Sequence, residues 1–81
     1  MNPAYVLKRN HILRMMAKTG KVSEYEIRSE IADYRVALLQ MNIDKLVELK
    51  VDALDKKGRW FITHEGGRLL AEIQAKDSDK R

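Results

Sequence analysis

Apolar residues recur at helical spacing along the first part of the chain. From residue 3 to about residue 18, one face is apolar and the rest is polar and basic, which predicts an amphipathic helix. The apolar positions are Tyr5, Ile12, Leu13 and Met16. Asn2 followed by Pro3 predicts the helix start, because Asn caps helices and Pro suits the first helical position. Gly20 predicts that the helix ends before it.

A capping box predicts a second, shorter helix. Ser23 is followed three residues later by Glu26, so that each side chain can bond the backbone N–H near the other. The predicted helix runs from Glu24 to about Ile31, with Ile27 facing the core. Val22, directly before the capping box, is expected to be either a short strand residue or a hydrophobic staple for this helix.

The longest periodic segment follows Asp33, which we expect to cap a third helix from Tyr34 to Lys50. A helical wheel places five aliphatic side chains on one broad inner face. They are Leu38, Leu39, Ile43, Leu46 and Leu49. The opposite face carries mainly polar side chains together with Tyr34, Ala37 and Met41. This pattern predicts that Met41 is exposed.

The next segment predicts a β-hairpin and a last helix. Residues 55–59 are charged and contain one Gly, as expected of a hairpin tip, and residues 60–63 are rich in β-formers. Trp60 should face the core, and Phe61 should point the other way. Thr63 can then cap a helix from His64 to Ala75. We expect one apolar cluster at the base of the hairpin, made of Leu46, Leu49, Leu54, Ile62 and Leu69.

The end of the hairpin also carries a family resemblance. Ile62-Thr63-His64-Glu65-Gly66, followed by Leu69-Leu70, resembles the L-T-x-x-G-x-x-L-L stretch of MarR-like and PadR-like regulators. It is also similar to small archaeal winged-helix DNA-binding proteins. The resemblance implies an α+β winged helix-turn-helix, in the order α-α-α-β-β-α with a two-stranded wing. We expect residues 1–76 to form this domain and residues 77–81 to form a frayed polar tail.

Composition narrows the classes of protein that need considering. The chain has 81 residues and no cysteine, which excludes disulfides and thiolate metal sites. No apolar run approaches the roughly 20 residues of a membrane span, and the first residues lack the pattern of a signal peptide. We therefore expect a soluble cytoplasmic protein with no membrane partner. The net charge of +4 favours polyanionic partners.

No pattern typical of catalysis occurs in the sequence. His11 and His64 are far apart and lack metal-ligand spacing, and there is no Gly-rich phosphate loop. Ser23 is accounted for by helix capping. We expect that the protein is not an enzyme and that it has no cofactor and no metal.

The resemblance implies sequence-selective binding of double-stranded DNA, as a small transcriptional regulator. It also implies a homodimer, formed through the two terminal helices. The predicted DNA-contacting residues lie on the outer side of the third helix and on the wing. They are Tyr34, Arg35, Gln40, Lys45, Lys56, Lys57 and Arg59.

A protein-binding role is the alternative. The second helix is acidic, and Asp44 and Glu48 reduce the positive charge of the third, which suits a duplex poorly. The chain would then be a winged-helix adaptor or an inhibitor of another machine, for instance one carried by a mobile element. Met41 and Phe61 are the candidate protein-contacting residues, because apolar groups have no evident reason to face phosphates.

Overall fold

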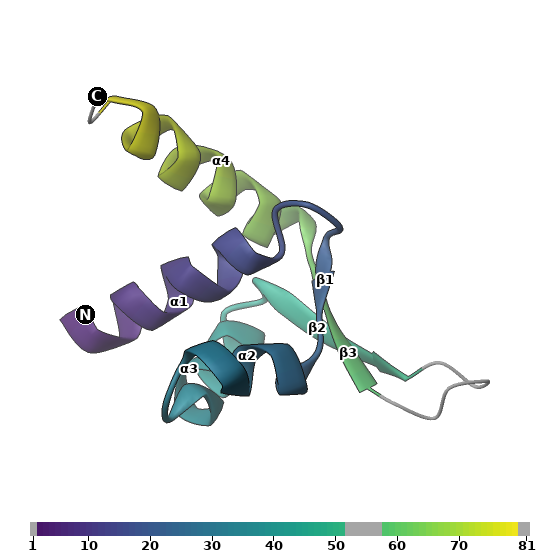
Figure 1. Ribbon diagram of the computed structural model, residues 1–81. Helices are drawn as coiled ribbons and strands as arrows, with labels where there is room; N and C mark the ends of the chain where they lie inside the picture. Colours follow the sequence, from purple (N-terminus) through teal and green to yellow (C-terminus); the bar gives the residue numbers. More distant parts are fainter. Residues whose placement is uncertain (1, 52–57, 80–81) are drawn as a thin grey trace.

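The computed structural model describes residues 2–51 and 58–79. This part of the chain is an α+β structure, with helices packed on one side of a three-stranded antiparallel sheet (Figure 1). The strand order is β1-β3-β2, and the arrangement is compatible with a winged helix. In chain order the elements are α1 (Pro3–Met15), β1 (Lys21–Val22), α2 (Glu24–Glu30), α3 (Tyr34–Ile43), β2 (Val47–Val51), β3 (Gly58–Ile62) and α4 (His64–Asp79).

The signals for the first two helices are confirmed. The Asn2 side chain accepts a hydrogen bond from the N–H of Ala4. Ser23 and Glu26 form the predicted capping box at the start of α2. Gly20 takes a left-handed conformation, with φ of 76°, and its N–H donates to the carbonyl of Met16. The chain can therefore turn sharply from α1 into β1, as the sequence predicted.

The third helix is shorter than predicted, because it ends at Ile43 and not at Lys50. Lys45 has a left-handed φ of 63°, and its N–H donates to the carbonyl of Asn42. The N–H of Leu46 reaches back to the carbonyl of Met41 at 2.9 Å. These two bonds form a Schellman motif, which satisfies the last carbonyls of the helix and redirects the chain. Residues 47–51 are consequently strand β2.

The buried face of α3 also differs from the predicted one. Ala37, Leu38 and Met41 are buried, whereas Leu39 and Ile43 are exposed. The prediction was wrong because it treated residues 46 and 49 as part of the helix, and their apolar side chains shifted the expected face. In the shorter helix, residues 37, 38 and 41 share the side that packs against the rest of the core.

The start of α3 lacks the capping bond that we expected from Asp33. Asp33 occupies the N-cap position, but its φ is 53° and its side chain makes no capping hydrogen bond. A left-handed residue is unusual at an N-cap, where the backbone is normally extended. The turn between α2 and α3 is therefore set by this backbone conformation and not by a side-chain cap.

The sheet has one inner face and one outer face, because side chains alternate along each strand. Trp60 of β3 pairs with Val22 and Leu49, and this row faces the helices. The core joins the inner face to α1, α2, α3 and α4. Its buried members are Ile12, Leu13, Met16, Val22, Ile27, Ile31, Ala37, Leu38, Met41, Val47, Trp60, Leu70 and Ile73. The inward position of Trp60 is confirmed.

The predicted cluster at the hairpin base forms only in part. Leu46, Ile62 and Leu69 are partly buried and pack against the core. Leu49 is 49% exposed and does not belong to the buried core. Leu54 lies outside the described residues.

Thr63 joins the sheet to the last helix. Its hydroxyl accepts a hydrogen bond from the N–H of Gly66 and donates one to the carbonyl of Lys45. The predicted cap is confirmed, and it also ties α4 to the turn after α3. The helix continues to Asp79, so residues 77–79, expected in a frayed tail, belong to it. Arg14 on α1 holds this last turn through two hydrogen bonds to Asp77, of 2.9 and 3.0 Å.

Candidate nucleic-acid interface

The side of the sheet that faces away from the helices carries most of the charge on the strands. On β3, Arg59 and Phe61 alternate with the inward-facing Trp60. The register places Lys21 and Glu48 beside Phe61, and Lys50 beside Arg59. We call this surface the outer sheet face; it consists of Lys21, Glu48, Lys50, Arg59 and Phe61.

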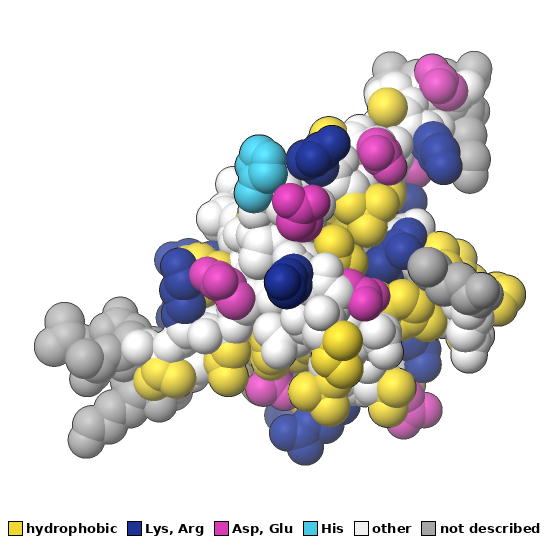
Figure 2. Space-filling model, turned by 180° about the vertical axis from the view of Figure 1, so that it is seen from behind, with side chains coloured by type: hydrophobic (Ala, Val, Ile, Leu, Met, Phe, Trp, Pro, Cys, Tyr) yellow, Lys and Arg dark blue, Asp and Glu magenta, His cyan; other side chains and the backbone are white. Residues whose placement is uncertain are grey.

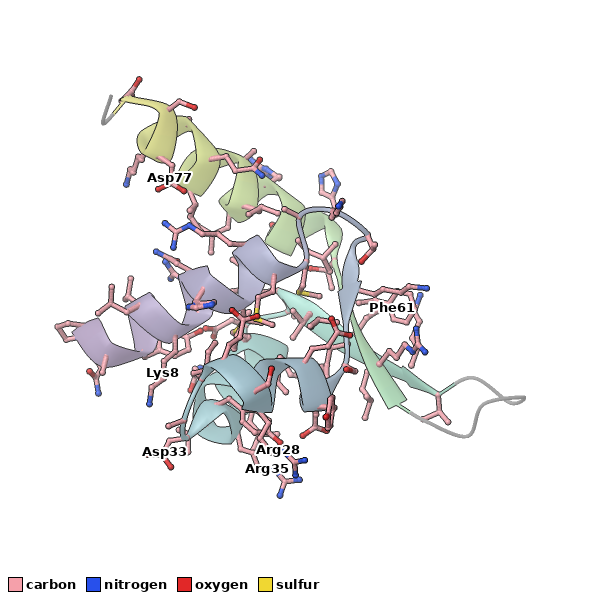
Figure 3. All side chains as sticks on the ribbon, viewed as in Figure 1. Lys8, Arg28, Asp33, Arg35, Phe61 and Asp77 are labelled. Atoms are coloured by element: carbon pink, nitrogen blue, oxygen red, sulfur yellow. The ribbon has the colours of Figure 1, made fainter. Side chains whose placement is uncertain are left out.

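An aromatic ring lies at the centre of the outer sheet face. The Lys50 ammonium is 5.1 Å from the centroid of the Phe61 ring, within the range of a cation–π contact. The same ammonium is 3.4 Å from a carboxylate oxygen of Glu48. Figure 3 shows Phe61 projecting from the sheet away from the helices, with nitrogen-tipped side chains beside it. The outward position predicted for Phe61 is confirmed.

The outer sheet face is positively charged overall. Three cations, Lys21, Lys50 and Arg59, stand beside one acid, Glu48. The sequence adds Lys56 and Lys57 between β2 and β3, although these two predicted contact residues lie outside the described part of the chain. An antiparallel strand pair that carries cations on one face can bring them to a phosphate backbone.

The predicted contact residues on and after α3 occupy four different environments. Tyr34 is half-buried, and its hydroxyl donates to Glu24 at 3.1 Å. Arg35 is exposed, and its Nε is 3.9 Å from the same carboxylate. Gln40 donates to Asp44 at 3.1 Å, and Lys45 lies in the turn beyond the helix. These residues do not form a continuous basic surface.

Two arginines project from the pair of helices α2 and α3. Figure 3 shows Arg28 of α2 and Arg35 of α3 both pointing towards the bottom of the view. Arg28 also lies over the Tyr25 ring, 5.6 Å from its centroid. Glu24 is close by on α2 and takes part in contacts with both Tyr34 and Arg35. The local charge beside these arginines is therefore mixed.

The outward side of α3 is apolar along its length. Val36, Leu39 and Ile43 are 77%, 57% and 72% exposed. Their spacing of three and four residues places them on one side of the helix. We call these three residues the α3 stripe. Figure 2 shows the molecule from behind, where yellow hydrophobic side chains gather along its lower part.

The two residues that we predicted as protein contacts differ in their exposure. Met41 is fully buried, so the prediction that it is exposed was wrong; the shorter α3 turns it towards the core. Phe61 remains accessible on the outer sheet face. The sequence reasoning did not include Lys21 and Lys50 in the site. The alternation of polar and apolar residues in Val47–Val51 is the signal that could have found Lys50.

Titratable groups do not assemble into a reactive centre in the described part of the chain. No group of three or more metal-ligating side chains occurs there. The Nε2 atom of His11 on α1 is 3.2 Å from the Oε1 atom of Glu30 on α2, at an exposed site. Partial burial and a hydrogen bond to Asp44 raise the pKa of the Tyr5 phenol to about 12. These contacts stabilise the packing of helices and have no evident chemical role.

Within residues 2–51 and 58–79, no helix combines the length and apolar character needed to cross a membrane. Comparison with known proteins found no relative. No family model, no curated protein and no solved structure matches the chain.

Proposed function

We propose that the chain binds double-stranded DNA as a small winged-helix-type regulator, and that the outer sheet face makes the main contact with the phosphate backbone. The observation that carries the proposal is the row of Lys21, Lys50 and Arg59 around the outward-facing Phe61. The proposal is supported by the net charge of +4 and by the antiparallel β2–β3 pair, from which the chain continues into Lys56 and Lys57.

Contacts between cations and phosphates provide affinity that does not depend on sequence. Each neutralised phosphate releases condensed counterions, so that binding weakens as salt rises. The strands hold Lys50 and Arg59 opposite each other on the same face, so both can reach one backbone. Phe61, next to this pair on the same face, offers an apolar surface to the sugars of the backbone.

The helix α3 is less suited to the main contact. Its outward side carries the α3 stripe, and the acids Glu24 and Asp44 lie near its two ends. Arg35 is the residue of α3 that best fits base recognition, because a guanidinium can bond guanine in two places. In this proposal, Arg35 discriminates between sites, and the outer sheet face supplies the affinity.

A salt titration with a matched control tests the proposal. Binding of a fluorescent random-sequence duplex is measured by anisotropy over a range of salt concentrations, for the natural protein, Lys50→Ala and Lys76→Ala. Lys76 is an exposed cation on α4, so its replacement removes the same charge far from the sheet. Lys50→Ala should lower the slope of log affinity against log salt by about 0.9, as expected for one lost phosphate contact.

Lys76→Ala should leave that slope unchanged. Equal effects of the two substitutions would mean that net charge, and not the outer sheet face, determines binding. The absence of any salt-dependent binding by the natural protein would remove the DNA proposal altogether.

A protein-binding adaptor is the second candidate function, and the α3 stripe favours it. Apolar side chains that lie together on an exposed helix are typical of protein interfaces. The variant Leu39→Asp separates the two functions. It should leave duplex binding intact if the outer sheet face binds DNA, and it should abolish binding to a protein partner that uses α3.

A further inference from the structure

The Phe61 ring lies in the middle of the outer sheet face and is only half-buried. Phe61 belongs to the central strand β3, between Lys21 of β1 and Glu48 of β2. Its ring points away from the helices (Figure 3). The bases of a duplex are covered by their neighbours in the stack, so they cannot lie flat on such a ring. The bases of a single strand can do so, because each of them has an open π-face.

We infer that the outer sheet face also binds single-stranded DNA, with one base stacked on Phe61 and the neighbouring phosphates on the surrounding cations. Lys21 is directly beside Phe61, and Lys50 and Arg59 form the next pair along the same face. Residues two apart in a strand are separated by about 7 Å, so these cations can reach the phosphates next to a stacked base. The inference uses the cations of the proposed duplex contact, and to that extent it rests on the proposed function.

The Lys50 side chain has to leave the ring when a base stacks on it. Its ammonium is 5.1 Å from the ring centroid and 3.4 Å from a carboxylate oxygen of Glu48. The side chains of Lys50 and Glu48 are 60% and 54% exposed, and ion pairs this exposed contribute little stability. A phosphate can therefore replace Glu48 as the partner of Lys50, which leaves the ring to the base.

A hollow beside Arg59 continues this surface towards α2. The two residues of β1 pair with residues 60 and 61 of β3, and after Ser23 the chain turns into α2. The start of α2 therefore lies beside the first residues of β3. The hollow between them is lined by Ser23, Glu24, Tyr25, Gly58 and Arg59.

Tyr25 gives this hollow a second aromatic ring. The Tyr25 side chain is 72% exposed, and the Arg28 guanidinium lies over its ring, 5.6 Å from the centroid. The hollow thus repeats the combination of a ring and a cation that Phe61 and Lys50 form. Glu24 also lines it, but this carboxylate accepts a hydrogen bond from Tyr34. A strand with one base on Phe61 can pass Arg59 and place a further base on Tyr25.

Three ligands test the inference on the natural protein. They are an oligothymidylate, an abasic oligomer of the same length, and a random-sequence duplex, each labelled and followed by fluorescence anisotropy at one salt concentration. The two single strands carry the same phosphates, so a difference between them measures the bases. The oligothymidylate should bind at least about 5-fold more tightly than the abasic oligomer, as one stacked base would give. Equal affinities would overturn the inference.

Variants of the two rings locate the stacking. Phe61→Leu keeps an apolar side chain on the sheet, and it should remove most of the preference for the oligothymidylate while leaving duplex binding nearly unchanged. Phe61→Tyr is the matched control, because it keeps the ring and should keep the preference. Tyr25→Leu should weaken binding of the oligothymidylate several-fold and leave binding of the abasic oligomer unchanged. Circular dichroism checks that each variant is folded.

The outcomes separate this inference from the proposed function. A preference for the oligothymidylate that survives in Phe61→Leu would overturn the inference, and no effect of Tyr25→Leu would remove Tyr25 from the site. Duplex binding without any preference between the two single strands would overturn the inference and leave the proposed function standing. A base-dependent single-strand affinity without duplex binding would support the inference and remove the proposed function.

Discussion

At the scale of single residues, Gly66 in the first turn of α4 packs closely against the turn that follows α3. A Cβ atom placed on Gly66 would overlap the backbone carbonyl of Leu46 and would lie 2.9 Å from the Ile62 side chain. Neither the carbonyl nor the strand can move away easily, since Thr63 bonds the same turn. Gly66 is therefore required because no side chain fits, and not because of its backbone conformation.

Gly66→Ala should lower the free energy of unfolding by about 1–3 kcal/mol, the usual cost of overpacking. Gly67→Ala is the matched control, because nothing lies within 4 Å of a Cβ there. Removing a helical Gly at an open position should raise stability by up to about 1 kcal/mol. Urea denaturation measures both changes, and equal effects of the two substitutions would contradict the packing described here.

Tyr5 carries a phenol whose ionisation depends on the fold. Burial and the hydrogen bond to Asp44 raise its pKa from 10.0 to about 12, so the folded state favours the protonated phenol. The stabilisation is complete below pH 10.0 and is lost as the pH rises towards 12. Subtracting the ultraviolet absorbance titration of Tyr5→Phe from that of the natural protein isolates this phenol. A midpoint near 10.0 would show that the contact is absent in solution.

At the scale of elements, α3 illustrates why one helix was predicted with the wrong length and the wrong face. Helices often end at a left-handed Gly, but here Lys45 adopts that conformation. A lysine in a run of helix-forming residues gives no local sign of an end. The hydrogen bond from Thr63 to the Lys45 carbonyl and the one from Asn42 to Val47 support the turn, and the first of these is long-range. Both depend on the folded structure, so the sequence pattern could not reveal them.

The elements predicted correctly have local signals. Asn2 and Pro3 mark the start of α1, Ser23 with Glu26 marks α2, and Thr63 marks α4. The outward position of Phe61 follows from strand alternation alone. The candidate site was predicted only in part, because Lys50 belongs to the strand that was taken for a helix end.

Comparing substitutions at two apolar positions tests which face of α3 is buried. Met41→Ala should cost about 2–5 kcal/mol of stability, because Met41 is fully buried. Leu39→Ala should cost much less, because Leu39 is mostly exposed. Thermal or urea unfolding measures the difference. A larger loss at Leu39 than at Met41 would favour the face that the sequence alone predicted.

At the scale of the whole molecule, two surfaces of different character lie on different elements. The outer sheet face is cationic and has Phe61 at its centre, and the α3 stripe is apolar. We propose that the first surface binds DNA, whereas the second is the surface that a protein partner would use in the alternative function.

The most direct test of this account is to map the DNA-binding surface by nuclear magnetic resonance. A random-sequence duplex is added to the isotope-labelled protein, and the shift of each backbone amide is followed. We predict that the largest changes occur at Lys21, Lys50, Arg59 and Phe61, with little change at Val36 and Leu39. Largest changes on α2 and the outward side of α3, with none on the sheet, would contradict the account.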